Sequence, residues 1–243
     1  MPAGHATSYV REESTVDRLL PFKDREEAGK ELSRALGEFR GKNVAVLGMP
    51  RGGVVVAREV AEVLDAPLDI VVTRKIGAPG EPEFALGAVT QEGDVIVNSQ
   101  AAESVGATAK YLQEEARRKK SEVKERMKSL RGNMPYPSLE EKTVIIVDDG
   151  MATGNSMRAA VQSVKKRNPK EVVVAVPVAP REAVAELSRG GTRVVCLEQP
   201  RFFFAIGEFY KDFEQVEDAE VRELLESVWN RHGPKSAPQT PVG

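Results

Sequence analysis

The sequence predicts an α/β fold with a parallel-sheet core that helices flank on both faces. Short apolar runs without alternation, such as "NVAVLG" and "TVIIV", are typical of strands that are buried on both faces. These runs alternate with amphipathic segments, a pattern that indicates βαβ units. The chain of 243 residues, 41% hydrophobic and 30% charged, is long enough to bury a substantial core. We therefore expect a single domain over residues 13–232.

The first predicted helix follows Asp24, which lies three residues before Glu27 as in a capping box. Apolar residues recur at helical spacing along one face of this segment, and Gly41 ends it. The strand "NVAVLG", the turn "GMPRGG", a helix over about 54–64 and the strand "LDIVVT" follow in order. Strand, turn and helix in this order predict the first βαβ unit.

The middle of the chain departs from this alternation. Closely spaced prolines and glycines predict a mobile loop at Gly77–Pro82. The runs "GAVT" and "DVIVN", separated by "QEGD", predict a β-hairpin. A helical stretch over about 101–130 follows, and its acids and bases are spaced as on a solvated helix. Residues from about 88 to 140 are therefore expected to form a helical and hairpin insertion.

The alternation returns in the last third of the chain. The predicted elements are, in order, the strand Thr143–Val147, a helix over 155–167, a strand over 171–176, a helix over 181–188 and a strand over 193–197. The proline-rich, polar residues 233–243 are expected to form a disordered tail.

Composition excludes several kinds of site. The one cysteine, Cys196, lies in the apolar run "RVVCLE" and is expected to be an inert buried thiol. The only histidines, His5 and His232, lie near the chain ends, which disfavours a His-based triad or a His-rich metal site. The net charge of −2 gives no basic field for nucleic acid. No apolar run reaches the length of a membrane span and no signal-peptide stretch opens the chain, so we expect a cytoplasmic protein without a membrane partner.

Two unusual loops follow predicted strands, "GMPRGG" and "DDGMATGNS". In open α/β sheets ligands bind beyond the carboxyl ends of the strands, so both loops are expected at one site. The backbone N–H groups of "MATGNS", at a helix start, suit a phosphate. Helix capping would explain one of Asp148 and Asp149 but not both, because adjacent carboxylates repel. A ligand with vicinal hydroxyls, held directly or through Mg²⁺, would use both, and a phosphate beside a diol describes ribose 5-phosphate.

The stretch "VIIVDDGMATGNS" resembles the binding motif of the type I phosphoribosyltransferases. "GMPRGG" resembles the pyrophosphate loop of that family, and "RK" before a Gly/Pro-rich loop resembles its mobile catalytic loop. The segments "MPRGGVVVAREVA", "RKIGAPGEPEFALGAV", "VPVAPRE" and "FAIGEFYKDFEQV" resemble a subgroup of bacterial and archaeal phosphoribosyltransferases whose acceptor is undefined. The likeness covers about residues 15–230 and implies the fold of the family.

This resemblance implies a role for each loop. Asp148 and Asp149 would bind the ribose hydroxyls of phosphoribosyl pyrophosphate and Mg²⁺, directly or through water. The 5′-phosphate would lie against the turn, and the pyrophosphate against the first loop. The catalytic residues implied are Arg74 and Lys75, which would neutralise the leaving group, and Asp149. The phosphate-binding residues implied are Ala152, Thr153, Gly154, Asn155 and Ser156, and the pyrophosphate-binding residues are Pro50, Arg51, Gly52 and Gly53.

The acceptor site of the family lies under a variable hood, which residues of about 198–215 would form here. Its aromatic side chains suit stacking on a planar base, and Phe203 and Tyr210 are the candidates; a core role for each ring stays open. Ala152 stands where the 6-oxopurine members carry an aspartate, which disfavours a hypoxanthine- or guanine-type activity. The acceptor is left undefined by the sequence.

The implied function is a Mg²⁺-dependent phosphoribosyltransferase of nucleotide metabolism, in which a nitrogenous acceptor displaces pyrophosphate at ribose C1. The family implies a homodimer. An alternative is a regulator that senses phosphoribosyl pyrophosphate or a nucleotide without turnover. A sugar-phosphate hydrolase is a weaker alternative, because no Cys, His or Ser has an evident activating partner.

Overall fold

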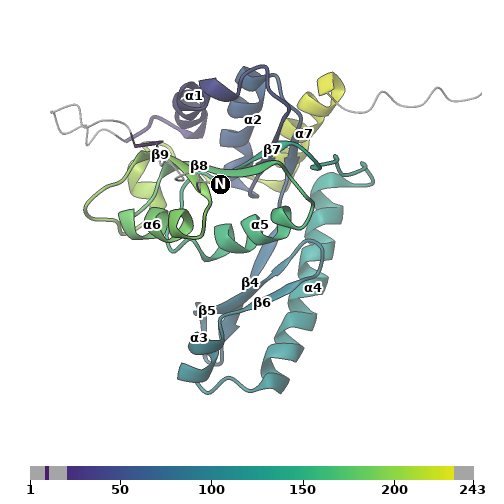
Figure 1. Cartoon of the computed structure of the whole chain (residues 1–243), viewed down its shortest axis with the longest axis vertical. Coiled ribbons are helices and arrows are strands. Elements are labelled where there is room, and N and C mark those ends of the chain that lie inside the picture. The colour runs from purple at the N-terminus through teal and green to yellow at the C-terminus, as the bar shows by residue number, and fades with distance from the viewer. Residues whose placement is uncertain (1–8, 11–20, 233–243) are drawn as a thin grey trace, which may run out of the picture.

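A computed structural model describes residues 9–10 and 21–232, and its core is one six-stranded sheet (Figure 1). The strands lie in the order β1-β9-β8-β7-β2-β3, and all their pairings are parallel. Their bounds are β1 Tyr9–Val10, β2 Val44–Gly48, β3 Leu68–Ile70, β7 Thr143–Val147, β8 Glu171–Val178 and β9 Arg193–Glu198. The strands β2 and β7 are buried along their whole length, as their unbroken apolar runs predict.

Helices cover both faces of this sheet and give it two separate apolar cores (Figure 1). One face carries α1 Arg25–Ala35, α2 Gly52–Leu64 and the C-terminal α7 Asp218–His232. The other carries α5 Asn155–Lys165 and α6 Arg181–Arg189. The predicted α/β class with a helix-flanked parallel sheet is confirmed. The tail predicted at residues 233–243 lies outside the described residues.

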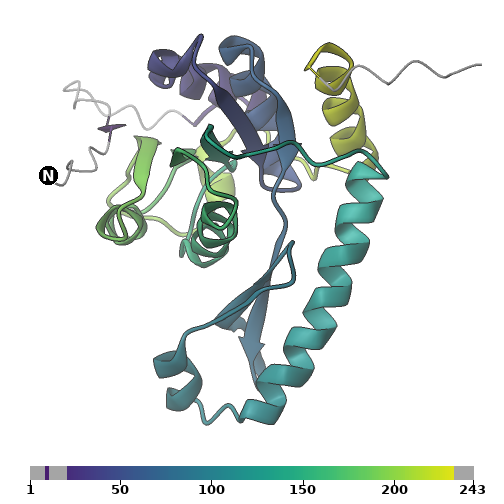
Figure 2. The same cartoon turned by 45° about the vertical axis from the view of Figure 1, so that its right-hand side comes forward.

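A second, smaller lobe projects from the core between β3 and β7 (Figure 2). It contains an antiparallel sheet in the order β4-β5-β6 and two helices. The bounds are β4 Thr73–Ala78, β5 Glu81–Thr90, β6 Val95–Val97, α3 Ser99–Ser104 and α4 Ala109–Arg131. The predicted hairpin is present as β5 and β6. The lobe begins at β4, earlier in the chain than the residue near 88 that the sequence indicated.

The residues predicted as a mobile loop, 77–82, instead form the end of the hairpin β4/β5, with only Pro79 and Gly80 between the strands. The register shifts on both sides of Gly77, which is how a bulge appears in a ladder. A Cβ on Gly77 would lie 2.5 Å from the Pro82 carbonyl oxygen, so the strands approach too closely for a side chain. The glycines and proline that suggest a loop therefore serve a bulge and a tight turn.

The predicted single helical stretch over 101–130 is two helices. Gly106, with a φ of 66°, separates them, and Thr108 caps α4 by accepting from the Tyr111 N–H at 3.2 Å. The Tyr111 hydroxyl then donates to the Gly77 carbonyl at 2.9 Å and fixes α4 against the hairpin. A positive φ followed by a capping threonine thus interrupts an otherwise regular helical pattern.

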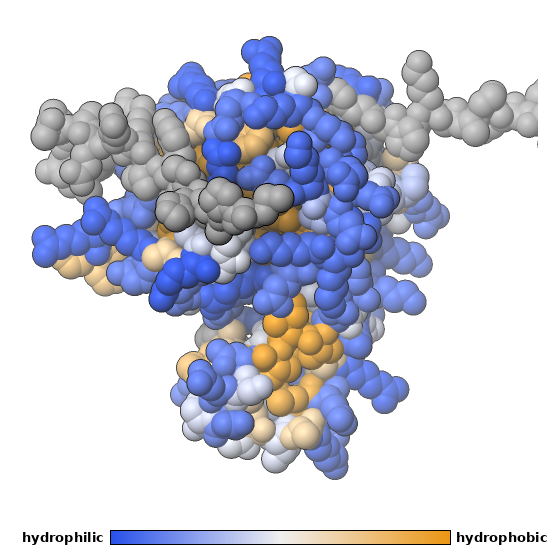
Figure 3. All heavy atoms as spheres, in the orientation of Figure 1, coloured by the Kyte–Doolittle hydropathy of each residue, from blue (hydrophilic) through white to orange (hydrophobic). Residues whose placement is uncertain are grey.

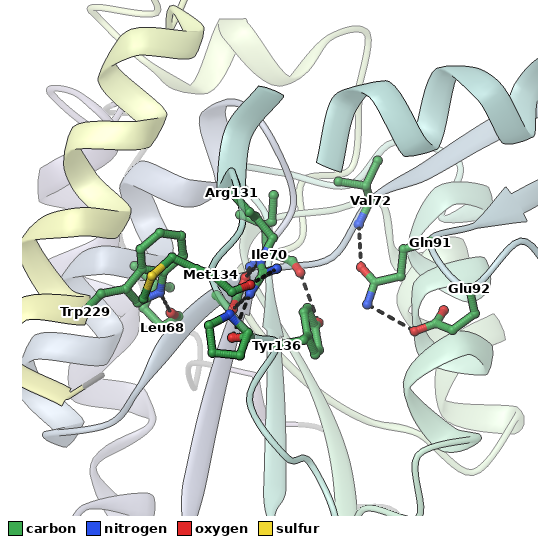
Figure 4. Close-up of polar contacts among 11 residues, drawn as sticks. Leu68, Ile70, Val72, Gln91, Glu92, Arg131, Met134, Tyr136 and Trp229 are labelled. Atoms are coloured by element: carbon green, nitrogen blue, oxygen red, sulfur yellow. Dashed lines mark hydrogen bonds and ion pairs between the residues drawn. The ribbon is translucent and has the colours of Figure 1, made fainter. Parts of the chain in front are cut away.

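A buried ion pair anchors the far end of α4 to the core (Figure 4). Arg131 donates to both carboxylate oxygens of Asp69 in β3, with Nε to Oδ1 at 2.6 Å and an Nη to Oδ2 at 2.7 Å. The backbone carbonyls on either side of Asp69 accept hydrogen bonds as well. Trp229 Nε1 donates to the Leu68 carbonyl at 2.9 Å, and the Tyr136 hydroxyl donates to the Ile70 carbonyl at 3.0 Å. The lobe, β3 and α7 therefore meet in one polar junction.

The lobe also carries an apolar patch on the face seen in Figure 3. The edge strand β6 exposes Val95 and Val97, and Val105 after α3 is exposed as well. These side chains lie on the lobe and not over the parallel sheet. Within the described part of the chain, no helix combines the length and apolarity that crossing a membrane requires.

Candidate functional site

The two unusual loops leave adjacent strands at the same level. In the β2/β7 pairing Gly48 lies opposite Val147, and the Met49 N–H donates to the Val147 carbonyl at 2.8 Å. The first loop runs from there into α2, through a cis peptide bond between Pro50 and Arg51. The second loop runs into α5. The predicted meeting of the loops at the carboxyl edge of the sheet is what the backbone shows.

Contact between the loops is so close that two glycines are required. A Cβ on Gly52 would lie 2.0 Å from Asp149 Oδ2 and 2.6 Å from Arg25 Nε. A Cβ on Gly53 would lie 2.6 Å from Asp148 Oδ1 and 2.8 Å from the Asp148 Cα. Real Cβ contacts are longer than these distances, so the start of α2 is packed directly against both carboxylates.

Backbone donors face this junction from two helices. Neither α2 nor α5 has a side-chain cap among the described residues, whereas α1 is capped by Asp24 and α4 by Thr108. The first N–H groups of a helix have no intrahelical acceptor, and the helix dipole favours an anion there. Gly154 is the N-cap residue of α5, and its φ of 71° is a conformation that glycine adopts without strain. Both helix starts are therefore suited to hold phosphate oxygens.

Asp149 is enclosed by groups from two segments that are distant in the sequence. Arg25, the first residue of α1, donates from Nε to Asp149 Oδ2 at 2.7 Å, and its side chain is only 11% exposed. Tyr210 donates its hydroxyl to the Asp149 carbonyl at 2.5 Å. The guanidinium of Arg25 lies 3.8 Å from the centre of the Phe213 ring, which stacks on Tyr210 at 5.0 Å. Asp149 thus has a cationic partner, which supplies a structural role for the second carboxylate that the sequence did not reveal.

The carboxyl group of Asp148 is buried beside the carboxylate of Asp149, which makes its ionisation unfavourable. Burial raises the pKa of its carboxyl well above the ordinary value, and the charge of Asp149 raises that pKa further. Its Oδ1 accepts from the Asp149 N–H at 2.9 Å, which opposes the shift without cancelling it. Arg25 is engaged by Asp149 and lowers the pKa of Asp148 only weakly.

The raised pKa of Asp148 predicts a pH-dependent stability in the free protein. Between the ordinary and the raised pKa, the folded chain binds more protons than the unfolded chain, so the free energy of unfolding falls as pH rises. Each unit of pKa difference corresponds to about 1.4 kcal/mol. Asp148→Asn removes this titration and should gain stability relative to wild type as pH rises. Urea unfolding across that pH range measures the difference, and a difference that does not vary with pH would contradict the assignment.

The residues predicted to bind a 5′-phosphate form the turn before α5 and the first two residues of that helix. Ala152, Thr153 and Ser156 are exposed, and Gly154 is buried. The Asn155 side-chain oxygen accepts from Arg158, which also pairs with Glu186 of α6. The turn therefore presents backbone N–H groups and two hydroxyls to solvent.

The predicted cations lie on the side of the site that faces the lobe. Arg51 extends toward the start of α7, 3.6 Å from Asp218 and 3.9 Å from Glu217. Arg74 lies in β4, and its Nε is 3.8 Å from Glu122 of α4. Lys75, the next residue of β4, is half-buried. Arg74 and Lys75 thus belong to an ordered strand and not to a loop.

The two predicted acceptor residues lie in a hood, defined as residues 199–217, that follows β9. The hood packs over Gly150, where a Cβ would lie 2.6 Å from Ile206. Phe203 is partly exposed and stacks on Phe209 at 5.4 Å. Tyr210 is 5% exposed, lies between the rings of Phe22 and Phe213 and bonds Asp149. Phe203 therefore has the exposure that stacking needs, and Tyr210 positions Asp149.

Sequence reasoning missed Arg25, Phe213 and Asp218. Arg25 lies 124 positions from Asp149, and an arginine in the first turn of a helix is a common surface residue. Asp218 opens α7, a helix that the sequence analysis did not predict. The one available signal was the spacing of Tyr210 and Phe213, which places two aromatic rings close together within the hood. Cys196 is as inert as predicted, because burial raises the pKa of its thiol to about 12.

Two adjacent carboxylates at the sheet edge are a donor set that suits Mg²⁺. This ion keeps several waters and binds proteins through one or two carboxylates together with substrate phosphates. The described residues contain no cluster of three His, Cys, Asp or Glu side chains that would hold a metal on their own. Asp148 and Asp149 therefore fit an ion that a phosphorylated ligand shares.

Comparisons with known proteins agree with this geometry. The model of the phosphoribosyl transferase domain matches residues 16–214. The chain is 40% identical over 205 residues to "Putative phosphoribosyl transferase Rv0571c" of Mycobacterium tuberculosis. The match covers 84% of this chain and 46% of that protein, so the chain spans about half the length of that relative. The crystal structure of TT1426 from Thermus thermophilus matches with a TM-score of 0.75 and 43% identity, over 86% of this chain and 99% of that one. The chain belongs to the phosphoribosyl transferase domain family.

Proposed function

We propose that this protein transfers ribose 5-phosphate from phosphoribosyl pyrophosphate to a nitrogenous acceptor, with release of pyrophosphate. The observation that carries the proposal is the contact between the two loops, in which Gly52 and Gly53 lie directly against Asp149 and Asp148. Carboxylates for a diol, and two uncapped helix starts for phosphates, then lie within one small region. These are the groups that a sugar carrying a phosphate and a pyrophosphate requires.

In this proposal each group of the site has a separate task. The carboxylates of Asp148 and Asp149 accept hydrogen bonds from the ribose hydroxyls, and the turn before α5 donates N–H groups to the 5′-phosphate. The start of α2 and Arg51 bind the pyrophosphate, whose negative charge grows as the bond to C1 breaks. Mg²⁺, held by Asp148 and Asp149 directly or through water, would supply further positive charge to the leaving group.

Arg25 and Tyr210 prepare Asp149 for this task. Both donate to Asp149, one at the carboxylate and one at the backbone carbonyl, so the residue is fixed before a ligand arrives. Neither donor uses the second carboxylate oxygen of Asp149. Fixing a binding group in advance lowers the entropy cost of binding.

The acceptor proposed is a nucleobase or a similar planar nitrogen compound. Phe203, stacked on Phe209 in the hood and partly exposed, presents a ring for such a base. Ala152 leaves no carboxylate in the turn to act as a base toward a 6-oxopurine ring. Arg74 and Lys75 approach the leaving-group side from the lobe.

A homodimer is part of the proposal. The exposed valines of the edge strand β6, Val95 and Val97, offer an apolar surface on the lobe that a second copy would cover. An unpaired edge strand is also a ready template for pairing with another chain.

Binding of phosphoribosyl pyrophosphate tests the proposal directly. We expect the double variant Asp148→Asn/Asp149→Asn to lose measurable affinity for phosphoribosyl pyrophosphate with Mg²⁺ in calorimetry, because each side chain exchanges an acceptor oxygen for an amide nitrogen, which cannot accept from a ribose hydroxyl or bind the ion. The matched control is Glu140→Gln/Glu141→Gln, an exposed adjacent pair of acids before β7, at the opposite end of that strand. Equal affinity in the two double variants would overturn the assignment.

A screen of bases for pyrophosphate release, with phosphoribosyl pyrophosphate and Mg²⁺ supplied, then separates enzyme from regulator. Release with one class of base identifies the acceptor. Tight binding of phosphoribosyl pyrophosphate without release for any base would favour the sensing regulator.

A further inference from the structure

Three arginines from separate segments gather where the lobe meets the core. Arg51 comes from the loop before α2, Arg74 from β4 and Arg126 from α4. Arg51 and Arg126 share one carboxylate, because Asp218 Oδ1 lies 3.6 Å from an Nη of Arg51 and Asp218 Oδ2 accepts from Arg126. Arg126 therefore reaches the same carboxylate as a residue of the proposed pyrophosphate loop.

Arg74 completes the group beside Arg126. Burial lowers the pKa of Arg74, and the nearby positive charge of Arg126 lowers it further, while Glu122 and Asp218 oppose this only in part. Two cations are thus held close together in a partly desolvated place. Such an arrangement is stable when an anion with several oxygens lies between them.

Asp218 is bonded directly by Arg126, but its contact with Arg51 is incomplete. Its Oδ1 is buried without a hydrogen-bond partner, and the contact with Arg51 is longer than a hydrogen bond. Ion pairs at partly exposed positions stabilise a fold by about 1 kcal/mol or less, so stability alone does not explain why two arginines share this carboxylate. A pyrophosphate group carries more charge and more oxygens than one carboxylate, so it could engage Arg51 fully while it also accepts from Arg126.

We propose that Arg126, on the lobe helix α4, is a pyrophosphate-binding residue and that Asp218 occupies the place of the anion while the site is empty. The inference rests on the proposed function, because it uses Arg51 as a pyrophosphate ligand. It gives the lobe a direct part in the site. When pyrophosphate or the pyrophosphate group of the cosubstrate binds, Arg51 and Arg126 transfer their contacts from Asp218 to its oxygens.

Calorimetry with inorganic pyrophosphate and Mg²⁺, on the full chain, tests this assignment. Arg126→Ala should weaken pyrophosphate binding by about 10- to 100-fold, because one charge-assisted contact is lost. The matched control Arg118→Ala removes an exposed arginine of the same helix, paired with Glu115, and should leave the affinity unchanged. Asp218→Asn should tighten pyrophosphate binding, because a competing carboxylate is removed while the side chain keeps its shape.

The direction of the Asp218 effect separates binding from a structural role. If the network only held the lobe in place, Asp218→Asn would weaken binding as Arg126→Ala does, and the inference would be overturned. It would equally fail if Arg126→Ala bound pyrophosphate as tightly as Arg118→Ala. Should Arg126→Ala not fold, the tightening in Asp218→Asn decides alone.

The proposed function is judged separately, by the Asp148/Asp149 variant and phosphoribosyl pyrophosphate. If that variant loses binding while Arg126→Ala does not, the function stands and the present inference falls. If pyrophosphate binding depends on Arg126 but phosphoribosyl pyrophosphate binding is indifferent to Asp148 and Asp149, the anion site stands and the function falls. A wild-type protein that binds neither ligand would overturn both.

Discussion

Alanine in place of Gly52 is expected to weaken the binding of phosphoribosyl pyrophosphate by at least about 100-fold, the loss of two charge-assisted hydrogen bonds. The new Cβ would lie 2.0 Å from Asp149 Oδ2, so the carboxylate must leave its position. Arg25 holds that carboxylate at 2.7 Å, and its own Nε would lie 2.6 Å from the Cβ. A shift of either group alone breaks the ion pair.

The same substitution should leave the fold largely intact. Alanine at the first residue of α2 lowers the entropy of the unfolded chain relative to glycine, which offsets part of the strain. Gly37→Ala is the matched control, because a Cβ at Gly37 meets no atom within 4 Å. Calorimetric titration of the three proteins measures the effect. Affinities for Gly52→Ala and Gly37→Ala within about threefold of each other would show that the loop contact does not form the site.

Removal of Arg131 is expected to produce the largest loss of stability. Arg131→Met leaves Asp69 buried without its cation, and breaking a buried pair in this way costs about 3–5 kcal/mol. For a chain of this size the melting temperature should fall by roughly 10 °C. The single tryptophan, Trp229, bonds the adjacent Leu68 carbonyl and reports unfolding by fluorescence, alongside circular dichroism.

Two comparisons isolate the buried charge as the cause. Asp69→Asn/Arg131→Met, which removes both charges, should be more stable than Arg131→Met alone. Arg118→Met, at an exposed ion pair of the same helix, should change the free energy of unfolding by less than about 1 kcal/mol. Burial already raises the pKa of Asp69 against the opposing effect of Arg131, and loss of Arg131 raises that pKa further. Arg131→Met should therefore become less stable as pH rises, and a pH-independent deficit would contradict a charge-based cause.

The parallel core was predictable because its signals are local. Uninterrupted apolar runs such as Thr143–Val147 can bury both faces only inside a helix-covered sheet, and the structure places that strand at the centre. The meeting of the two loops followed from the same reasoning, because parallel strands end at one edge. Family motifs then assigned roles to the loop residues, and those roles stay predictions.

The features that sequence reasoning missed depend on distant partners. Gly77 and Pro82 suggest a loop when taken by composition, and only the register of β4 against β5 shows that they form a bulge and a turn. The partner of Asp149 is 124 positions away at Arg25, and that of Asp69 is 62 positions away at Arg131. No periodicity records such pairs. The surplus charge of the acidic pair therefore has two explanations, a ligand and Arg25, of which the sequence offered only the first.

The helix α4 is long, and its ionic contacts with the core lie near its C-terminal end. Its 23 residues span about 35 Å, at a rise of 1.5 Å per residue. The ion pair of Arg131 with Asp69 and the contact of Arg126 with Asp218 both lie in the last two turns of the helix. A tilt of about 5° at that base moves the opposite end by roughly 3 Å, from the length of the rod. If an exchange of anions at Arg126 tilted the helix by that angle, the hairpin and the apolar edge of β6 would move with it.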